Sequence, residues 1–202
     1  QPTKPITLYG FKLSGHSHRA ELMLRLMDLP YRFEEIDIFN GAQQTERFGQ
    51  LNCFRSVPVI DDDGTVISDS VAILSYLARR YDGNPRWFPV DPTGSAEVQR
   101  WLSVAQNQVA HGPAAARVIQ RFGVKRDLAQ AQALAARLFK VLEGELATRS
   151  FLVDGHPTIA DVALYSYIAA APEGGIDMKP YVAIDRWLKR VEALPRFEPM
   201  PL

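Results

Sequence analysis

The sequence predicts two domains of different class, a small α/β domain with a mixed four-stranded sheet followed by an all-helical domain. Over residues 5–82, short runs rich in β-formers alternate with segments of helical periodicity. Beyond residue 92, almost every segment has helical periodicity. Residues 84–92, NPRWFPVDP, contain three prolines, which is typical of a linker. We therefore expect domains at residues 1–83 and 93–202, joined by this linker.

The first half begins with a β-α-β pattern. Residues 6–11, ITLYGF, form a short apolar run rich in β-formers and predict the first strand. A helix follows, because apolar residues recur at i, i+3, i+4 and i+7, namely Ala20, Met23, Leu24 and Met27. Pro30 ends this helix, and residues 31–38 predict the second strand.

The same half continues with a weak helical pattern at residues 43–50 and a predicted hairpin over residues 57–68, where an Asp/Gly turn separates two apolar runs. The next helix has Gly83 as its C-terminal cap and one apolar face, made of Val71, Leu74, Leu77 and Ala78. A parallel βαβ unit packs its helix on the sheet, and an antiparallel hairpin must add beside it. The element order therefore predicts the thioredoxin arrangement.

The second half is predicted to be a helical bundle. Asp91 caps its first helix and Pro92 occupies the first turn. This segment is either one long helix or two helices joined near Gly112-Pro113. The next helix has an apolar stripe of Leu128, Ala131, Ala135, Leu138 and Leu142, and the segments TIADVALYSYIAA and YVAIDRWLKRVEAL follow it. The two tryptophans of these helices, Trp101 and Trp187, are expected to be packing residues.

Composition argues against several classes of partner. The 202 residues have a formal net charge of zero and no long run of one sign, so we expect no nucleic-acid or anionic-membrane partner. No apolar run reaches the roughly 18 residues that a membrane-spanning helix needs. The first ten residues lack the pattern of a secretion signal. With a single cysteine, Cys53, no internal disulfide can form, and a soluble cytoplasmic protein is expected.

The stretch LSGHSHRAEL places serines and histidines where the first strand meets the first helix. Ser14 with His16 or His18 suggests a hydrolase pair, but the chain has no G-x-S-x-G elbow and no distinctively placed third acid. His16-x-His18 suggests a metal site, but the only other histidines, His111 and His156, are distant in sequence. We therefore expect neither a Ser-His hydrolase nor a metal ion.

Two further motifs suggest a ligand with peptide and amino-acid character. Proline in an apolar strand is tolerated at an edge or with a cis peptide bond. A cis Val57–Pro58 bond would turn the Val57 backbone outward, whereas the alternative is a proline that merely starts an edge strand. Asp69 and Ser70 stand at a helix N-terminus, where Ser70 can donate to a carboxylate and Asp69 can receive an ammonium group. The alternative for this pair is an ordinary helix cap.

Together these motifs resemble those of the cytosolic glutathione S-transferases. The matching segments are SGHSHRAELML, LNCFRSVPVIDDDGTVISDSVAILSYLA and TIADVALYSYI, and the resemblance covers essentially the whole chain. It implies a thioredoxin-like domain followed by a helical bundle, glutathione as co-substrate, no covalently bound cofactor and a homodimer. The serine motif is most similar to that of bacterial members with a zeta-like or nu-like loop.

The resemblance also implies roles for individual residues. It implies a cis bond before Pro58, binding of the γ-glutamyl end of glutathione by Asp69 and Ser70, and contact of Ser14 with the sulfur. Ser17 is the alternative sulfur contact or the helix cap. In the helical half, the family's aspartate that anchors a buried helix corresponds to Asp161, which also forms a capping-box-like pattern with Thr158.

The chain departs from the family pattern near the other end of the ligand. Ser56 stands where the family often has Gln or Lys, and His16 stands where related loops often have Asn. Both residues, with Val57, are expected at the glutathione site. Cys53 replaces a proline of the family pattern, and we expect it to be a small buried residue rather than a nucleophile.

The expected reaction is attack of the glutathione thiolate on a small hydrophobic electrophile by addition or substitution, as in detoxification. The electrophile pocket is expected between the domains, lined by Phe11, Leu13, Val104, Gln108 and His111, with Ala115 on the same helix face. His111 has a second interpretation, as a helix-end or interface residue. Two alternatives stay open: a non-catalytic binding protein of this fold, and an enzyme that uses glutathione to reduce disulfides or peroxides.

Overall fold

The computed structural model describes residues 1–153 and 155–201. These residues form two compact units, one made of Gln1–Pro85 with residues 195–201, and the other of Arg86–Leu194. The sequence assigns residues 93–202 to the helical domain, so the structure differs by returning the C-terminal segment to the first unit. That return depends on contacts between residues far apart in the sequence, which local patterns do not reveal.

The first unit contains a mixed sheet of four strands in the order β2-β1-β3-β4. β1 (Ile6–Gly10) pairs in parallel with β2 (Tyr31–Glu35) and antiparallel to β3 (Val59–Asp62). β3 continues through a tight turn into β4 (Thr65–Ser68), which is the predicted hairpin. This arrangement confirms the predicted thioredoxin-like sheet.

β2 is shorter than the predicted strand over residues 31–38. After Glu35, the Asp37 carboxylate accepts hydrogen bonds from the Asn40 backbone N–H at 3.1 Å and the Asn40 side chain at 2.6 Å. This side-chain hydrogen bond offers the backbone an alternative to the strand ladder, so the chain leaves the sheet here.

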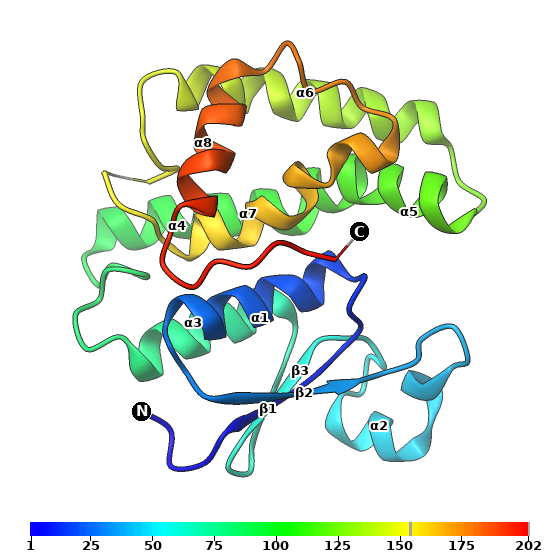
Figure 1. Ribbon diagram of the computed structural model, residues 1–202, viewed down its shortest axis with the longest axis vertical. Coiled ribbons are helices and arrows are strands. Elements are labelled where there is room, and N and C mark those ends of the chain that lie inside the picture. Colours follow the sequence, from blue (N-terminus) through cyan, green and yellow to red (C-terminus); the bar gives the residue numbers. More distant parts are fainter. Residues whose placement is uncertain (154, 202) are drawn as a thin grey trace. The chain divides into compact units, whose positions relative to one another are not determined.

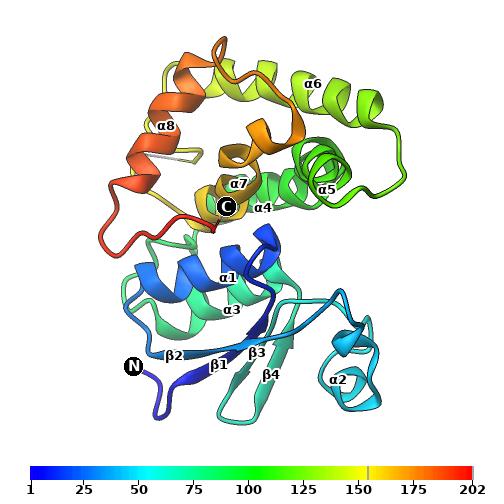
Figure 2. The same ribbon diagram turned by 45° about the vertical axis from the view of Figure 1, so that its right-hand side comes forward.

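Two helices, α1 (Gly15–Leu26) and α3 (Ser70–Tyr81), lie side by side on one face of the sheet (Figures 1 and 2). Their inward side chains are fully buried and include Leu22, Met23, Leu24, Ile73, Leu74 and Leu77. Where the sequence has a weak helical pattern at residues 43–50, the structure has a short helical turn (Ala42–Gln44) followed by α2 (Glu46–Leu51). The core of this unit therefore holds α1 and α3 against the sheet.

The second unit consists of helices. α4 (Pro92–Val104) runs through a π-helical stretch, η2 (Ala105–Ala114), into α5 (Ala115–Phe122). The remaining elements are α6 (Leu128–Leu146), α7 (Ile159–Ala169), the short η3 (Ala171–Gly174) and α8 (Val182–Glu192). Within residues 1–153 and 155–201, no helix combines the length and apolar character needed to cross a bilayer.

The π-helical stretch answers the question raised by Gly112-Pro113. The chain stays helical through Pro113, and the wider turns of η2 accommodate a residue that has no N–H to donate. Gly112 lies directly against α6, because a Cβ added there would come within 3.0 Å of the Ala135 nitrogen. Glycine is therefore needed at this position for η2 and α6 to approach each other.

The core of the second unit is organised around Asp161 at the start of α7. Asp161 and Thr158 form a capping box, as the sequence pattern predicts. The Asp161 carboxylate also accepts from the Leu152 N–H at 3.0 Å and from the Trp187 indole N–H at 2.9 Å. Trp187 and Trp101 are almost fully buried, which confirms that they are packing residues. Burial raises the pKa of Asp161, although these hydrogen bonds oppose the change.

Candidate functional site

The sheet register brings the three sequence motifs of the first unit to the same end of the sheet. Tyr9, near the end of β1, pairs with Val59, and Val59 pairs with Ser68. The loop into α1, the Val57–Pro58 bond before β3 and the start of α3 after β4 therefore all adjoin this end. Figure 2 shows α1 and α3 running from it on the same face of the sheet.

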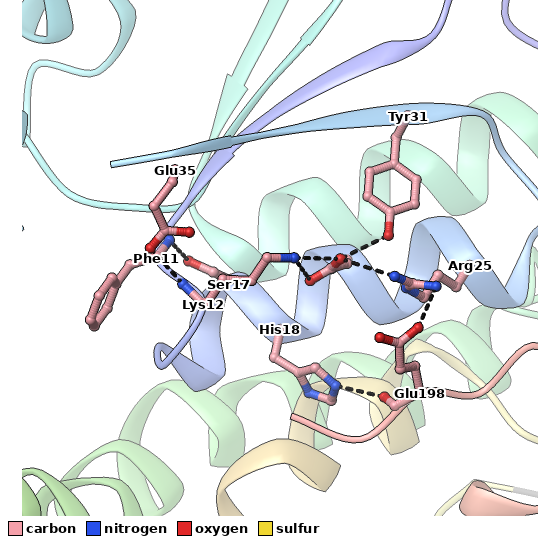
Figure 3. Close-up of polar contacts among 9 residues, drawn as sticks. Phe11, Lys12, Ser17, His18, Arg25, Tyr31, Glu35 and Glu198 are labelled. Atoms are coloured by element: carbon pink, nitrogen blue, oxygen red, sulfur yellow. Dashed lines mark hydrogen bonds and ion pairs between the residues drawn. The ribbon is translucent and has the colours of Figure 1, made fainter. Parts of the chain in front are cut away.

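Two serines of the β1–α1 loop are held in different ways. Ser14 is the N-cap of α1, and its hydroxyl oxygen accepts from the Ser17 N–H at 3.3 Å. Ser17 is 1% exposed, and its hydroxyl oxygen accepts from the Phe11 N–H at 3.0 Å (Figure 3). Ser14 is only partly buried. Since a hydroxyl that accepts a hydrogen bond still has its own proton to donate, Ser14 is the more accessible donor at this helix end.

His16 connects the start of α1 to the start of α3. Its Nδ1 lies 3.3 Å from the Ser70 hydroxyl oxygen and 2.9 Å from Nη1 of Arg19. The same Arg19 nitrogen lies 3.4 Å from the Ser70 oxygen. Arg19 is fully buried and Ser70 is 2% exposed. Burial and the neighbouring Arg19 charge lower the pKa of His16 to about 3, so the ring is neutral at physiological pH.

Asp69 caps α3 from an unusual backbone conformation. One of its carboxylate oxygens accepts from the N–H groups of Val71 at 2.9 Å and Ala72 at 3.0 Å. The residue has a φ of 76°, which is uncommon for a residue other than glycine and recurs at functional sites. Asp69 is nevertheless exposed. It is therefore a cap, as one interpretation holds, and its carboxylate is also accessible from outside.

The Val57–Pro58 peptide bond is cis, as the family resemblance implies. Pro58 is buried just before β3, and Val57 is partly buried. The preceding Ser56 is exposed, and its carbonyl oxygen accepts from the Asn52 side chain at 2.8 Å. Among the hydrogen bonds of residues 1–153 and 155–201, none involves the Val57 N–H or C=O. These two groups are the kind that an extended peptide can pair with.

The expected burial of Cys53 is wrong, because this residue is exposed. Asn52 takes the inward position instead, and its side-chain oxygen accepts from the Phe54 N–H at 3.0 Å. The turn that this creates directs Cys53 and Phe54 outward, and Phe54 is 83% exposed. The sequence shows that Asn52 and Cys53 are neighbours, but it does not show which of the two side chains points inward.

The remaining predicted residues are described within their own units. In the first unit, Phe11 is buried and its ring meets Phe39 edge-on at 5.3 Å, while Leu13 is partly buried. In the second, Val104 is partly buried and Gln108 is exposed. His111 is exposed and its ring nitrogen donates to the Asn107 carbonyl at 2.9 Å, so it is engaged with its own helix.

A polar cluster around Glu21, near the middle of α1, was not predicted. Glu21 is buried and accepts from Lys12 at 3.2 Å, Arg25 at 3.3 Å and the Tyr31 hydroxyl at 2.8 Å. The C-terminal segment joins this cluster, because His18 hydrogen-bonds the Glu198 carbonyl at 2.9 Å (Figure 3). His18 and Glu198 are far apart in the sequence, and no local signal connects them.

His16 and His18 therefore face different partners, Ser70 and Arg19 for the first and the Glu198 carbonyl for the second. Over the described ranges 1–153 and 155–201, no group of three or more His, Cys, Asp or Glu side chains is arranged to hold a metal ion.

Comparisons with known proteins agree with this geometry. Residues 13–80 match the model of the glutathione S-transferase N-terminal domain, and residues 107–195 match that of the C-terminal domain. A solved glutathione S-transferase from Pseudomonas fluorescens is 33% identical over 98% of this chain and 99% of its own, with a TM-score of 0.91. Maleylacetoacetate isomerase from Mus musculus is 30% identical over 98% of this chain and 92% of its own length.

Some relatives match over a shorter region. Glutathione S-transferase theta-2 from Rattus norvegicus is 32% identical over 97 residues, which is 48% of this chain and only 40% of the relative. The domain matches and the full-length relatives nevertheless cover both units. The chain therefore belongs to the glutathione S-transferase family.

Proposed function

We propose that this chain is a glutathione transferase that activates the glutathione thiol for attack on a small hydrophobic electrophile. The observation that carries the proposal is the meeting, at one end of the sheet, of the Ser14-capped helix, the cis Val57–Pro58 bond and the Ser70 helix start. These features supply a sulfur contact, a backbone bridge and an anion site. They match the three chemically distinct parts of glutathione.

In this proposal the γ-glutamyl end of glutathione binds at the start of α3. Ser70 donates to its carboxylate, and the exposed Asp69 receives its ammonium group. The Val57 N–H and C=O pair with the peptide part of the ligand, and Ser56 and His16 line the same end of the sheet. The support for this placement is that Ser70 lies 3.4 Å from the positively charged Arg19 nitrogen, a setting that favours an anion.

Activation of the thiol requires only a modest energy. A free thiol titrates near 8.5, and lowering its pKa by two units takes about 2.7 kcal/mol. A hydrogen bond to a charged group contributes roughly 1.5–3 kcal/mol, and a helix N-terminus adds about 0.3–1 kcal/mol. Ser14, whose oxygen already accepts the Ser17 N–H, is available to donate its proton to the sulfur. One donor at this helix end is therefore sufficient, and no general base is needed.

The electrophile is proposed to contact Phe11 and Leu13 of the first unit, and the roles expected of Val104, Gln108 and His111 stay predictions. Addition, substitution and the reduction of disulfides or peroxides all use the same thiolate. A relative named as an isomerase makes isomerisation a second candidate reaction at this site. A homodimer, a cytoplasmic location and a detoxification role belong to the same proposal, and the exposed Phe54 is an apolar residue available to a partner.

The proposal is tested by retention on immobilised glutathione followed by turnover of a generic aryl halide, a disulfide and a peroxide. We expect retention that free glutathione reverses, and conjugation of the aryl halide. Turnover of only the disulfide or the peroxide would identify a reductase. Retention without turnover of any of the three would identify a binding protein, and absence of retention would refute the glutathione site.

A further inference from the structure

Arg19 of α1 reaches the first residue of α3, Ser70. It is fully buried, and its Nη1 is 2.9 Å from Nδ1 of His16 and 3.4 Å from the hydroxyl oxygen of Ser70. A guanidinium group has N–H donors and no acceptor, and it does not lose its proton in proteins. Both partner atoms must therefore act as acceptors toward Arg19.

This requirement fixes the state of the His16 ring. Nδ1 accepts from Arg19, so it carries no proton, and the neutral ring has its proton on Nε2. A protonated Nδ1 would direct its N–H at an N–H of Arg19. In the imidazolium form, the two groups would also be two positive charges in contact. The lowered pKa of His16 agrees with this geometry.

The same geometry decides what the Ser70 hydroxyl can do. Nδ1 of His16 has a single lone pair in the ring plane, and Arg19 lies closer to it than Ser70 does, at 2.9 Å against 3.3 Å. The Ser70 oxygen can accept from Arg19, and its own proton then lacks an acceptor on His16. That proton is available to an anion at the start of α3.

We propose that Arg19 is a positioning residue that, by occupying His16 Nδ1 and donating to Ser70, directs the Ser70 proton to the ligand carboxylate. Arg19 itself does not touch the ligand. The buried positive charge next to Ser70 also favours a carboxylate over a neutral amide at this position. The inference rests on the proposed binding of the γ-glutamyl end of glutathione at Ser70 and specifies how that end is selected.

The binding test uses Arg19→Met, which preserves the length of the side chain and removes its charge and donors. Arg25→Met is the matched control, because Arg25 lies on the same helix and contacts Glu21 and Glu198 instead. Calorimetry measures binding of glutathione and of its analogue in which the γ-glutamyl carboxylate is an amide. Each variant is first checked for native circular dichroism.

We expect Arg19→Met to weaken glutathione binding at least tenfold, the scale of a lost hydrogen bond to a charged group. It should change binding of the amide by less than threefold. In a Ser70→Ala background, adding Arg19→Met should weaken glutathione binding by less than a further threefold, because both changes remove the same interaction. Arg25→Met should stay within twofold of the unaltered protein. Equal losses for both ligands, or losses that multiply with Ser70→Ala, would overturn the inference.

A second measurement depends neither on an Arg19 variant nor on any ligand. Long-range proton–nitrogen spectra of the unaltered protein at pH 7 report the tautomer of each of its four histidines, and His16→Asn assigns the His16 signal. The inference requires the Nε2–H form for His16. An Nδ1–H form or an imidazolium overturns it. If the unaltered protein fails to bind glutathione, the proposed function is wrong, whereas this spectrum separately decides whether Nδ1 of His16 accepts from Arg19.

Discussion

At the scale of single residues, the candidate site depends on which hydroxyl is held and which is accessible. Ser14 and Ser17 are three positions apart, and both oxygens accept a backbone N–H. Only Ser17 is fully enclosed. The sequence predicts a serine donor in this loop, and burial favours Ser14 over Ser17.

Replacing Ser14 by Ala should raise the pKa of the thiol of bound glutathione by one unit or more, because the thiolate loses a charge-assisted hydrogen bond. Thiolate absorbance followed against pH measures this pKa. Ser17→Ala is the companion variant, and we expect it to lower stability by removing the partner of the Phe11 N–H. If Ser14→Ala leaves the titration unmoved, Ser14 does not contact the sulfur.

His16 should make stability depend on pH. Its pKa is about 3 in the folded protein and about 6.5 in an unfolded chain, so between these values the unfolded state binds the extra proton. The free energy of unfolding should therefore fall as pH drops below 6.5, by up to about 1.4 kcal/mol per pH unit. Above pH 6.5 this dependence disappears.

Urea unfolding at pH 7.5 and pH 5 checks this prediction. The unaltered protein should lose about 2 kcal/mol from His16 between the two values. His16→Asn should lose correspondingly less, since the Asn side chain offers an acceptor to Arg19 and does not titrate. His18 has a pKa that burial also lowers, so some dependence will persist in the variant. An equal loss in both proteins would contradict the assignment to His16.

At the scale of helices and strands, the patterns that depend on neighbouring residues predict the structure well. The hairpin, the caps at Asp91 and Thr158 and the stripe of α6 are set by residues within a few positions of one another. The course of the chain at Pro113 is different. It depends on the approach of η2 to α6, which the local sequence does not encode.

Gly112→Ala should destabilise the protein by about 1–3 kcal/mol, because the added Cβ would lie 3.0 Å from the Ala135 nitrogen and force η2 away from α6. Gly144→Ala is the matched control, since Gly144 lies inside α6 with no neighbouring atom in the way of a Cβ. It should stabilise by about 0.5–1 kcal/mol. Urea unfolding measures the change in the free energy of unfolding for both variants. A change of the same sign in both would contradict the close approach of η2 to α6.

Asp161→Ala should cost at least about 3 kcal/mol, because it strands the Leu152 and Thr158 N–H groups and the Trp187 indole N–H in the core. Asp127→Ala removes an exposed cap of α6 and should cost about 1 kcal/mol. Chemical denaturation compares the two. Turnover per folded molecule should be unchanged by Asp161→Ala, and a selective loss of turnover would show a direct role in the reaction.

At the scale of the whole molecule, the sequence predicts the fold class and the meeting of three motifs. Both follow from the order of strands and helices, since the register of a thioredoxin-like sheet places the three loops at one end. Three features escape prediction, namely the burial of Arg19, the exposure of Cys53 and the return of the C-terminal segment. Each depends on partners distant in the chain.

Removal of residues 195–202 should destabilise the first unit. It exposes His18, which is 4% exposed, and deletes the Glu198 partner of His18 and Arg25. We expect a lower midpoint of thermal unfolding and faster hydrogen exchange in α1. Glu198→Gln keeps the carbonyl that His18 contacts and should change the midpoint little, because an exposed ion pair contributes at most about 1 kcal/mol. Unchanged exchange in α1 of the truncated protein would contradict this role.

The return of the C-terminal segment also sets an order of events during synthesis. The first unit is interrupted by the whole of Arg86–Leu194, so its last piece leaves the ribosome only after more than a hundred further residues. At about 5–20 residues per second, this delay lasts roughly 5–20 s. Throughout that interval the surface of α1 around His18 and Arg25 is open to water and to other chains, and the helical unit has all of its residues before the C-terminal segment is made.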